Sequence, residues 1–282
     1  MKLISFTSKG IQSYGVVDGN RVFDVGSVLS SQFPDLRSIL RADALGRLHE
    51  AQSDCPRLPL EDVTLLPPIP NPSKIFCIGH NYEEHRAEMN RPKTSYPSTF
   101  FRFADSQVGQ GGHVIAPRVS SEIDYEGELA VVIGKGGRYI AVEDALSHVA
   151  GYSCYNDISV RDWQRHTTQF GPGKNFPSTG GFGPWLVTAD EIPDPQNLEL
   201  TTTLNGDVVQ RANTNQMIFT VAELIAYCSS FTPLNAGDVI VSGTPGGVGM
   251  KRTPPLYMKA GDTVDVEISG IGKLALTLQA EV

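Results

Sequence analysis

The sequence has no long hydrophobic run, and no apolar stretch approaches the roughly 20 residues needed to cross a bilayer. The apolar part of Met1–Phe6 is too short for the hydrophobic region of a signal peptide. Disorder is not expected either, because 40% of the 282 residues are hydrophobic. We therefore expect a globular protein with no membrane partner, built as one large domain or as a main domain with a small one.

Positive charge and cysteine are also scarce. The chain has 23 Lys and Arg residues against 31 Asp and Glu residues, which gives a formal net charge of −8. No Lys/Arg cluster offsets this balance, so no nucleic-acid partner is expected. An anionic substrate would need a local metal ion or lysine. The four cysteines show no paired metal-ligand spacing, and their isolation indicates reduced thiols in a cytoplasmic protein.

Residues 1–55 have the pattern of a small separate α+β domain. Val16–Phe23 is typical of a hairpin with an Asp-Gly turn, and Asp35 could cap a helix running through Ile39, Leu40, Leu45 and Leu48. A proline-rich stretch, residues 56–72, predicts an extended linker. Residues 73–282 form the main domain, which is rich in strand patterns towards its C-terminal end. The predicted fold class is mainly β, a β-rich α+β protein.

Acidic residues alternate with other residues at the start of the stretch Ile123–Gly134. Its second half, Leu129–Ile133, is a continuous apolar run that predicts a buried strand. The alternation places Asp124, Glu126 and Glu128 on one face of that strand. Such carboxylates are costly to bury unless a cation lies between them, and their oxygens favour hard cations such as Mg²⁺, Mn²⁺ or Ca²⁺. The alternative is a strand end whose acids lie in water.

A second predicted strand, Gly151–Asp157, also ends in an acid. Asp157 is placed either to supply a third oxygen ligand or to cap a helix over Val160–Thr168. Further on, Gln169–Phe176 is a Gly/Pro-interrupted loop that presents Lys174. A lysine beside a metal site can hold a substrate carboxylate or stabilise a developing oxyanion, whereas a lone loop lysine is simply solvated.

A short strand, Lys74–Gly79, precedes a predicted helix over Tyr82–Met89 that ends at Asn90-Arg91-Pro92. His85 and Glu88 lie three residues apart on this helix, so their side chains can touch. A carboxylate beside an imidazole orients it and raises its basicity, as a general base requires. The alternative is a surface His-Glu pair that contributes little. The loop that follows is long, which favours a functional role.

The segment Val239–Gly249 predicts a strand that runs into a glycine-rich turn. This turn lacks the phosphate-loop pattern and does not open a clear helix, so nucleotide binding is not expected. Its free backbone N–H groups could still bind a carboxylate.

Five stretches together resemble the fumarylacetoacetate hydrolase family, over roughly residues 70–282, and occur in the family's order. The matching residues are Ile78–Tyr82 with His85 and Glu88, Asp124–Leu129, Asn156–Asp162, Gly173–Phe176 and Ser242–Gly249. The similarity is to bacterial acylpyruvate hydrolases and 2-hydroxyhepta-2,4-diene-1,7-dioate isomerases. It implies a β-roll around a divalent metal, Mg²⁺ or Mn²⁺, with the N-terminal unit as a small extra domain.

The resemblance also implies roles for individual residues. Glu126, Glu128 and Asp157 match the metal ligands. The His85–Glu88 pair matches the dyad that activates water, on a segment that often orders as a lid, and Lys174 matches the lysine that stabilises an enolate. The implied substrate-binding residues are Thr244, Tyr82, His80 and Gln169. His80 stands where acylpyruvate-cleaving members often carry Arg, and the run Arg165–Phe170 could contribute to the pocket instead.

The function that the resemblance implies is metal-dependent hydrolysis of a C–C bond in a 2,4-dioxo acid of the acylpyruvate or fumarylpyruvate type. The alternatives are isomerisation or decarboxylation of a 2-oxo dicarboxylic acid such as oxaloacetate or 2-oxohept-3-enedioate. A non-catalytic metal-binding module is a second alternative. The expected partners are a small 2-oxo acid substrate and a second copy of the chain, as a homodimer.

Overall fold

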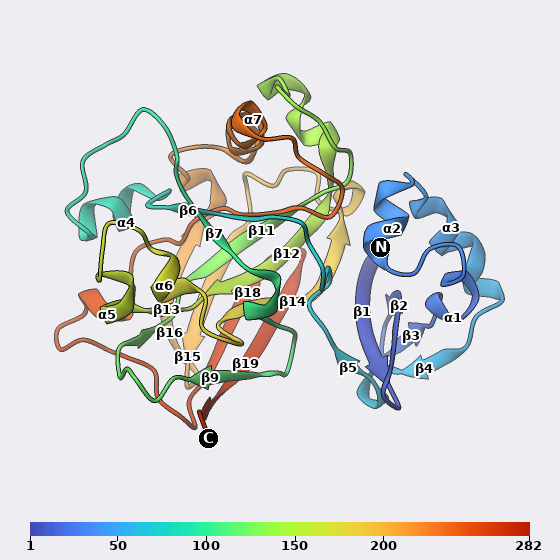
Figure 1. Cartoon of the computed structure of the whole chain (residues 1–282), viewed down its shortest axis with the longest axis horizontal. Coiled ribbons are helices and arrows are strands. Elements are labelled where there is room, and N and C mark those ends of the chain that lie inside the picture. Colours follow the sequence, from blue (N-terminus) through green and yellow to red (C-terminus); the bar gives the residue numbers. More distant parts are fainter.

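The computed structural model describes all 282 residues, and most of its elements are strands (Figure 1). The strands are β1 Lys2–Ser8, β2 Ile11–Asp18, β3 Arg21–Phe23, β4 Arg57–Pro59, β5 Thr64–Leu65, β6 Ile75–Gly79, β7 Ser98–Arg102, β8 Gln107–Val108, β9 His113–Ala116, β10 Ile123–Asp124, β11 Gly127–Ile133, β12 Val149–Asp157, β13 Ser159–Val160, β14 Gly180–Thr188, β15 Glu199–Leu204, β16 Asp207–Asn213, β17 Val239–Val241, β18 Thr263–Ile268 and β19 Gly272–Ala280. The α-helices are α1 Gly26–Leu29, α2 Leu36–Arg41, α3 Leu45–Glu50, α4 Glu83–Glu88, α5 Arg161–Gln164, α6 Gly171–Lys174 and α7 Val221–Phe231. The predicted mainly β fold class is confirmed.

Three sheets organise these strands. The largest has 12 strands, in the order β4-β3-β2-β1-β14-β12-β11-β17-β6-β7, with β5 on β1 and β8 on β14. A five-stranded sheet has the order β16-β15-β18-β19-β9, and β10 pairs with β13. The acidic stretch enters the middle of the largest sheet, because β11 lies between β12 and β17.

Strand β11 is buried on both faces, as its apolar run predicts. Leu129 and Val131 belong to a core of 36 buried residues shared with the five-stranded sheet. Ala130 and Val132 belong to a second core that reaches the N-terminal helices. The alternation of side chains along a strand therefore places β11 between two cores, which fixes its register firmly.

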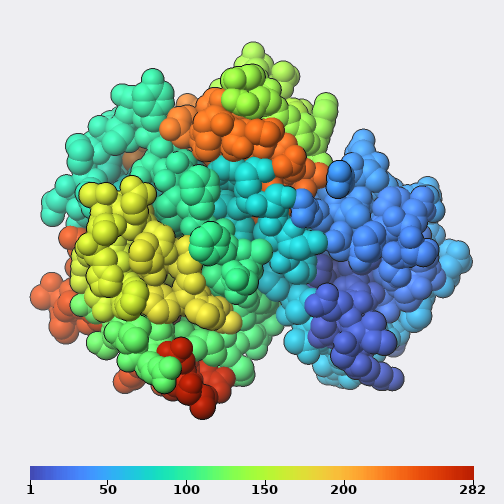
Figure 2. Space-filling view, viewed as in Figure 1, coloured from blue at the N-terminus to red at the C-terminus, as the bar shows by residue number.

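The N-terminal residues form a lobe beside the larger body (Figure 2). Its strand β1 nevertheless extends the large sheet, since Lys2 and Leu3 pair with Val187 and Leu186 of β14. The stretch 56–72 predicted as a linker contains β4 and β5, which pair with β3 and β1. This stretch is therefore hydrogen-bonded to the N-terminal lobe, and the division at residues 55 and 73 stays a prediction.

Three helix predictions require correction. Asp35 does cap a helix, in a capping box with Ser38, but α2 ends at Arg41 because Asp43 adopts a left-handed backbone (φ 52°) before α3 begins. The pattern of residues 142–149 also predicts a helix, and the structure has a 3₁₀ helix there, over Val142–His148. The helix expected over residues 160–168 is only the four-residue α5, and Asp157 does not cap it. No helix in the fold is both long and apolar enough to cross a membrane.

Candidate active site

Three buried carboxylates meet where β11 begins and β12 ends. The ligand oxygens of Glu126, Glu128 and Asp157 all lie within 4.8 Å of one another, and we call these residues the acid triad. The backbone brings them together, because the Asp157 N–H donates to the Glu126 carbonyl at 2.8 Å. Antiparallel pairing of β11 with β12 thus brings Asp157 beside Glu126 and Glu128, which precede it by 31 and 29 residues. The sequence prediction of a common oxygen site agrees with this geometry.

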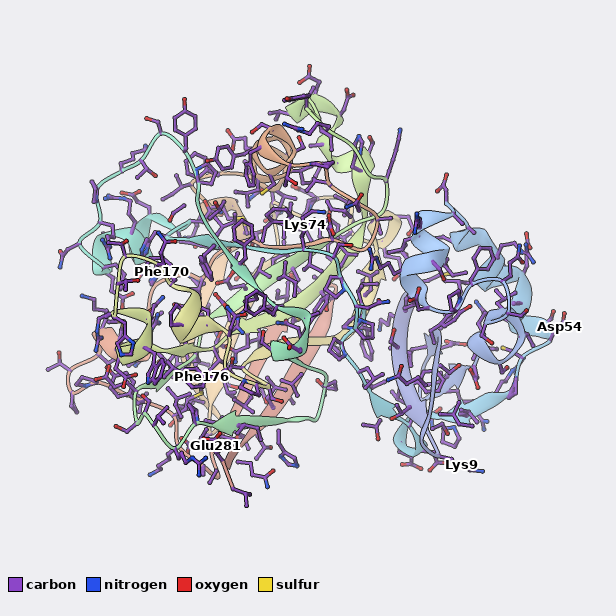
Figure 3. All side chains as sticks on the ribbon, viewed as in Figure 1. Lys9, Asp54, Lys74, Phe170, Phe176 and Glu281 are labelled. Carbon is purple, nitrogen blue, oxygen red and sulfur yellow. The ribbon has the colours of Figure 1, made fainter.

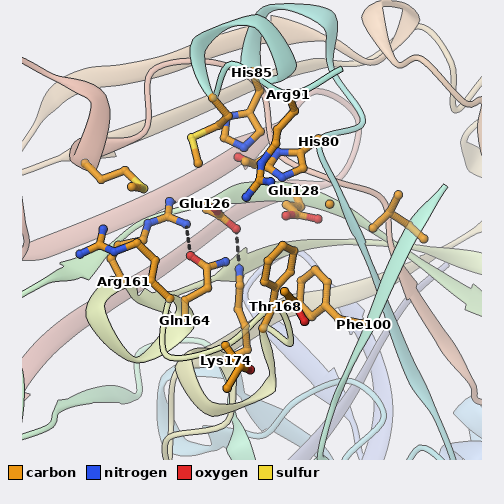
Figure 4. A pocket seen from close by; sticks show the side chains of 18 residues that line it. His80, His85, Arg91, Phe100, Glu126, Glu128, Arg161, Gln164, Thr168 and Lys174 are labelled. Carbon is orange, nitrogen blue, oxygen red and sulfur yellow. Dashed lines mark hydrogen bonds and ion pairs between the residues drawn. The ribbon is translucent and has the colours of Figure 1, made fainter. Parts of the chain in front are cut away.

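Lys174 lies against the acid triad and is not solvated, with only 1% of its surface exposed. Its Nζ donates to Glu126 Oε2 at 2.6 Å, to Asp157 Oδ2 at 2.5 Å and to the Asp157 carbonyl at 3.1 Å. All three N–H donors of the ammonium are therefore used inside the protein, and Figure 4 shows the bond to Glu126. Burial alone would lower the pKa of Lys174, but Asp157 and Glu126 raise it, so the side chain stays charged.

Two arginines, which the sequence reasoning did not identify, complete the buried charge cluster. Arg161 binds Asp124 Oδ2 with Nε at 2.8 Å and Glu126 Oε1 with Nη2 at 2.8 Å. Arg102 binds Asp157 Oδ1 at 2.5 Å. Asp124 is therefore bound by an arginine and lies outside the triad. The strand breaks between β10 and β11, so the alternation that grouped it with Glu126 and Glu128 does not continue.

Glu128 is the triad member without a cationic partner. Its only protein donor is the Gly243 N–H, at 2.5 Å, although the side chain is buried. Burial and the neighbouring Asp157 and Glu126 carboxylates raise the pKa of Glu128 well above its usual range. Glu126 shows the opposite: burial would raise its pKa, but Lys174 and Arg161 lower it.

This imbalance tests whether a metal ion fits the site. Four buried carboxylates, the triad and Asp124, are matched by only three buried cations, Lys174, Arg161 and Arg102. A divalent cation on the triad oxygens would supply the missing positive charge next to Glu128. Buried carboxylates provide only hard oxygen ligands, which suit Mg²⁺ or Mn²⁺. The residues present therefore fit the predicted metal.

The dyad predicted on α4 is formed. His85 Nδ1 lies 3.2 Å from Glu88 Oε2, and the Glu88 carboxylate also accepts from the Gly247 N–H at 3.2 Å. His85 is buried, yet its Nε2 has no hydrogen-bond partner in the protein and the ring borders the cavity above the triad (Figure 4). The contact with Glu88 thus orients the His85 imidazole as a general base requires. We call residues 83–91, which carry this pair, the lid segment.

The glycine-rich turn after β17 binds carboxylates of the protein itself. Its N–H groups at Gly243, Gly247 and Gly249 donate to Glu128, Glu88 and Asp124 respectively. Glycine is required at 243, where φ is +102° and a Cβ would come within 2.6 Å of Asn81. The turn therefore ties the triad, the dyad and Asp124 to one backbone segment.

A cavity of about 350 Å³ lies between the acid triad and the lid segment. Six of the predicted site residues line it: His80, His85, Glu126, Glu128, Lys174 and Thr244. The hydroxyl of Thr244 donates to the Gly127 carbonyl and accepts from Gln210, so it is already used within the protein. The run after α5 contributes Arg165, Thr167, Thr168 and Phe170, as expected. The other lining residues with polar or flexible side chains, which the prediction did not include, are Met89, Arg91, Arg161, Gln164 and Met250.

Two predicted substrate-binding residues do not line the cavity. Tyr82, the residue before α4, is buried, and its backbone forms a β-bridge with Met217. Gln169 is exposed and lines an outer groove together with Phe170 and Phe176. Figure 3 labels these two phenylalanines. The glutamine that reaches the cavity is Gln164, which α5 places one turn after Arg161 and whose Oε1 accepts from Arg161 at 3.0 Å (Figure 4).

Comparisons with known proteins give a consistent relationship. A family profile described as "Fumarylacetoacetate (FAA) hydrolase C-terminal" matches residues 74–279. The human protein named oxaloacetate tautomerase FAHD2A, mitochondrial, is 47% identical over 219 residues, which cover 77% of this chain and 70% of that protein. Among solved structures, maleylpyruvate hydrolase from Sphingobium sp. SYK-6, in complex with manganese(II) and pyruvate, matches with a TM-score of 0.84 and 29% identity over the whole of both chains. The 2-hydroxyhepta-2,4-diene-1,7-dioate isomerase from Mycobacterium marinum matches with a TM-score of 0.79 and 29% identity, covering 100% of this chain and 99% of that one.

Proposed function

This chain belongs to the fumarylacetoacetate hydrolase family, and from this premise we propose that it interconverts the keto and enol forms of an oxaloacetate-type 2-oxo dicarboxylic acid. The observation that carries the proposal is the free Nε2 of His85, which borders a cavity whose opposite side holds the acid triad. A base facing a site for a divalent cation is the arrangement that enolisation needs. The 47% identity to an oxaloacetate tautomerase favours this reaction over the others of the family.

His85 would move the proton. Its Nδ1 is held by Glu88, so Nε2 is the nitrogen that faces the substrate. Nε2 would take a proton from C3, the electron pair of the C–H bond would form the C2=C3 double bond, and O2 would become an enolate. The imidazolium would then return the proton to O2, which gives the enol and restores the base. The reverse sequence gives the keto form.

The buried cations would support the negative charge that develops on the substrate. Lys174 would act by its charge, because its three donors are used by Glu126 and Asp157. Gln164 and Arg161 border the same cavity and would orient the oxygens of the substrate. A divalent metal held by Glu126, Glu128 and Asp157 would supply Lewis-acid polarisation of the carbonyl when bound. Mg²⁺ and Mn²⁺ are both proposed, since three carboxylates suit either.

The test is a metal-dependent tautomerase assay. We expect purified protein with Mg²⁺ or Mn²⁺ to accelerate the decay of enol-oxaloacetate absorbance, and EDTA to abolish this acceleration. Pyruvate release is measured in parallel to detect decarboxylation. An enol decay rate equal to that of the buffer, with metal present, would contradict the proposal.

C–C bond hydrolysis is the second candidate. The structural match to maleylpyruvate hydrolase, whose structure holds manganese(II) and pyruvate, favours it. Here His85 would deprotonate a water that attacks C4 of a 2,4-dioxo acid, and breakage of the C3–C4 bond would release a carboxylic acid and the enolate of pyruvate. Metal-dependent release of pyruvate from acetylpyruvate or fumarylpyruvate would select this reaction. Metal binding without turnover of any of these compounds would instead favour a non-catalytic module.

We also propose a homodimer. The outer groove beside β7 is lined by aromatic residues, and among them Phe101 and Phe103 are 49% and 64% exposed. Because β7 is at the end of the large sheet, this apolar face has no cover within the chain. Light scattering of the purified protein tests the proposal.

A cytoplasmic location is proposed from the four free cysteines, whereas the names of several relatives place those proteins in mitochondria.

A further inference from the structure

Arg91 is the one cation on the cavity wall that has no acidic partner. Lys174 and Arg161 are bound by buried carboxylates, and Arg165 is paired with Glu122 at 2.6 Å. Arg91 is an exposed residue that borders the cavity, and its guanidinium makes neither a hydrogen bond nor an ion pair with the chain. Figure 4 shows it descending beside His80 toward the acid triad. In a protein of net charge −8, an unpaired cation in a cavity favours an anionic ligand at that position.

The backbone of the lid segment holds Arg91 in place. Asn90 ends α4 in a left-handed conformation, with φ 54°, which turns the chain back over the helix. The Arg91 N–H donates to the Arg86 carbonyl at 3.0 Å, and the Arg86 guanidinium donates to the Arg91 carbonyl. Arg86 is fixed in turn by Glu83 on the same helix. The backbone of Arg91 is therefore held at both its N–H and its carbonyl, whereas its side chain is free to bind a ligand.

His80 lies beside Arg91 and, unlike that exposed arginine, has buried polar atoms without a partner. Its backbone is left-handed (φ 58°), and its ring stacks on His85 with centroids 5.3 Å apart. Both ring nitrogens are buried without a hydrogen-bond partner. Burial and the neighbouring His85, with a further contribution from Arg91, lower the pKa of His80 to about 4, so the ring is neutral at pH 7 and retains one N–H donor. Unpaired buried donors are costly unless a ligand satisfies them.

We propose that Arg91 and His80 form a subsite for the second carboxylate of a dicarboxylic substrate. The inference rests on the proposed function, in which the 2-oxo end lies over the acid triad. A guanidinium binds a carboxylate through two parallel N–H donors, and the neutral His80 ring adds a third. A 2-oxo monocarboxylic acid would form no ion pair with Arg91 and would leave the buried His80 donor unpaired, so the subsite selects dicarboxylates.

A second chamber supports this assignment. A pocket of about 200 Å³ adjoins the cavity, and both are lined by His80, Arg91 and Phe170. Its remaining wall includes Lys93 and Arg86, so it is basic as well. Arg91 therefore lies at the junction of the two spaces, with room beyond it for a carbon chain longer than that of oxaloacetate. The basic wall would favour an anionic end group there too.

The experiment compares two 2-oxo acids of equal chain length, 2-oxoglutarate and 2-oxopentanoate, which differ only in the distal carboxylate. Their binding to the full chain with Mg²⁺ is measured by titration calorimetry. A charge-assisted hydrogen-bonded pair contributes enough for a preference of about tenfold for 2-oxoglutarate. We expect Arg91→Gln to remove this preference by weakening 2-oxoglutarate binding alone, and Arg91→Lys to retain part of it.

Arg165→Gln is the matched control, because it removes an arginine from the same wall whose charge is already neutralised by Glu122. We expect this variant to keep the preference of the native protein. Equal binding of the two acids by the native protein, or an equal loss of preference in both arginine variants, would overturn the subsite while leaving the proposed function intact. If neither acid bound, the 2-oxo acid substrate and the subsite would both be wrong.

Discussion

The two sides of the cavity are built in different ways. Below lies the charge cluster around the acid triad, in which Lys174 and Glu128 are 1% and 2% exposed and contacts come from distant parts of the chain. Above lies the lid segment, whose six-residue helix carries two exposed acids, Glu83 and Glu84, and whose contacts are mainly local. Its dyad reaches the rest of the protein through the Gly247 N–H. The difference indicates that folding itself preorganises the charges below, whereas the lid segment can be altered with little effect on stability.

The largest expected effect comes from Glu126→Ala, which breaks the lower side. The variant removes the carboxylate that Lys174 and Arg161 share. We expect loss of turnover, loss of tight Mg²⁺ binding and a decrease of about 3 kcal/mol in the free energy of unfolding, because a buried ion pair is broken from one side. Urea unfolding and Mg²⁺ calorimetry measure these effects.

Glu122→Ala is the control for this variant, since Glu122 also pairs with an arginine but is partly exposed. It should change the unfolding free energy by less than about 1 kcal/mol. Retained activity or retained Mg²⁺ affinity in Glu126→Ala would refute the metal site.

An intermediate effect is expected from His85→Ala, which acts on the lid segment. Loss of the base should lower tautomerase or hydrolase turnover by about 10²- to 10⁴-fold while Mg²⁺ affinity stays the same. Any decarboxylation of oxaloacetate should be spared, because that reaction needs no base to take a proton or activate water. Glu84→Ala, which removes an exposed acid from the same helix, should leave turnover unchanged. A native rate in the His85 variant would refute the role of the dyad.

The smallest expected effect concerns pH and His80. Because the folded protein lowers the pKa of His80 from 6.5 to about 4, the neutral ring stabilises the protein above pH 6.5, and this stability is lost as the pH falls toward 4. The ring is partly accessible, so the loss is expected to be about 1 kcal/mol. Thermal unfolding at several pH values should show a smaller acid-induced loss in His80→Gln. Parallel curves for the two proteins would contradict this assignment.

Local pattern was sufficient to predict several elements of the site. The apolar run after Glu128 predicted β11, and the three-residue spacing of His85 and Glu88 predicted their contact. The glycine-rich turn was expected to offer backbone N–H groups to a carboxylate, and in the structure these groups bind carboxylates of the protein itself. In each case the decisive interaction is made by neighbouring residues or by the backbone conformation that glycine permits.

Long-range partners were not predictable in the same way. Nothing near Asp157 indicates that Arg102, 55 residues earlier, binds it, and nothing near Lys174 indicates that it binds Glu126. That Gln164 lines the cavity and Gln169 does not was likewise not predictable, because it depends on where a four-residue helix ends. Alternation along a strand gives the face of a side chain, but the partner opposite that face is set by sheet pairing.

The sequence by itself determined the residue types of the site, the mainly β class and the local turns and caps, because these depend on spacing and on backbone preferences. Only the tertiary structure decided which charges meet, that Lys174 has no free donor, and that Arg91 alone on the cavity wall lacks an acidic partner. The physical reason is that, in a buried site, the free energy of a charged group depends on every neighbour within a few ångströms. Those neighbours come from strands and loops that only the fold brings together.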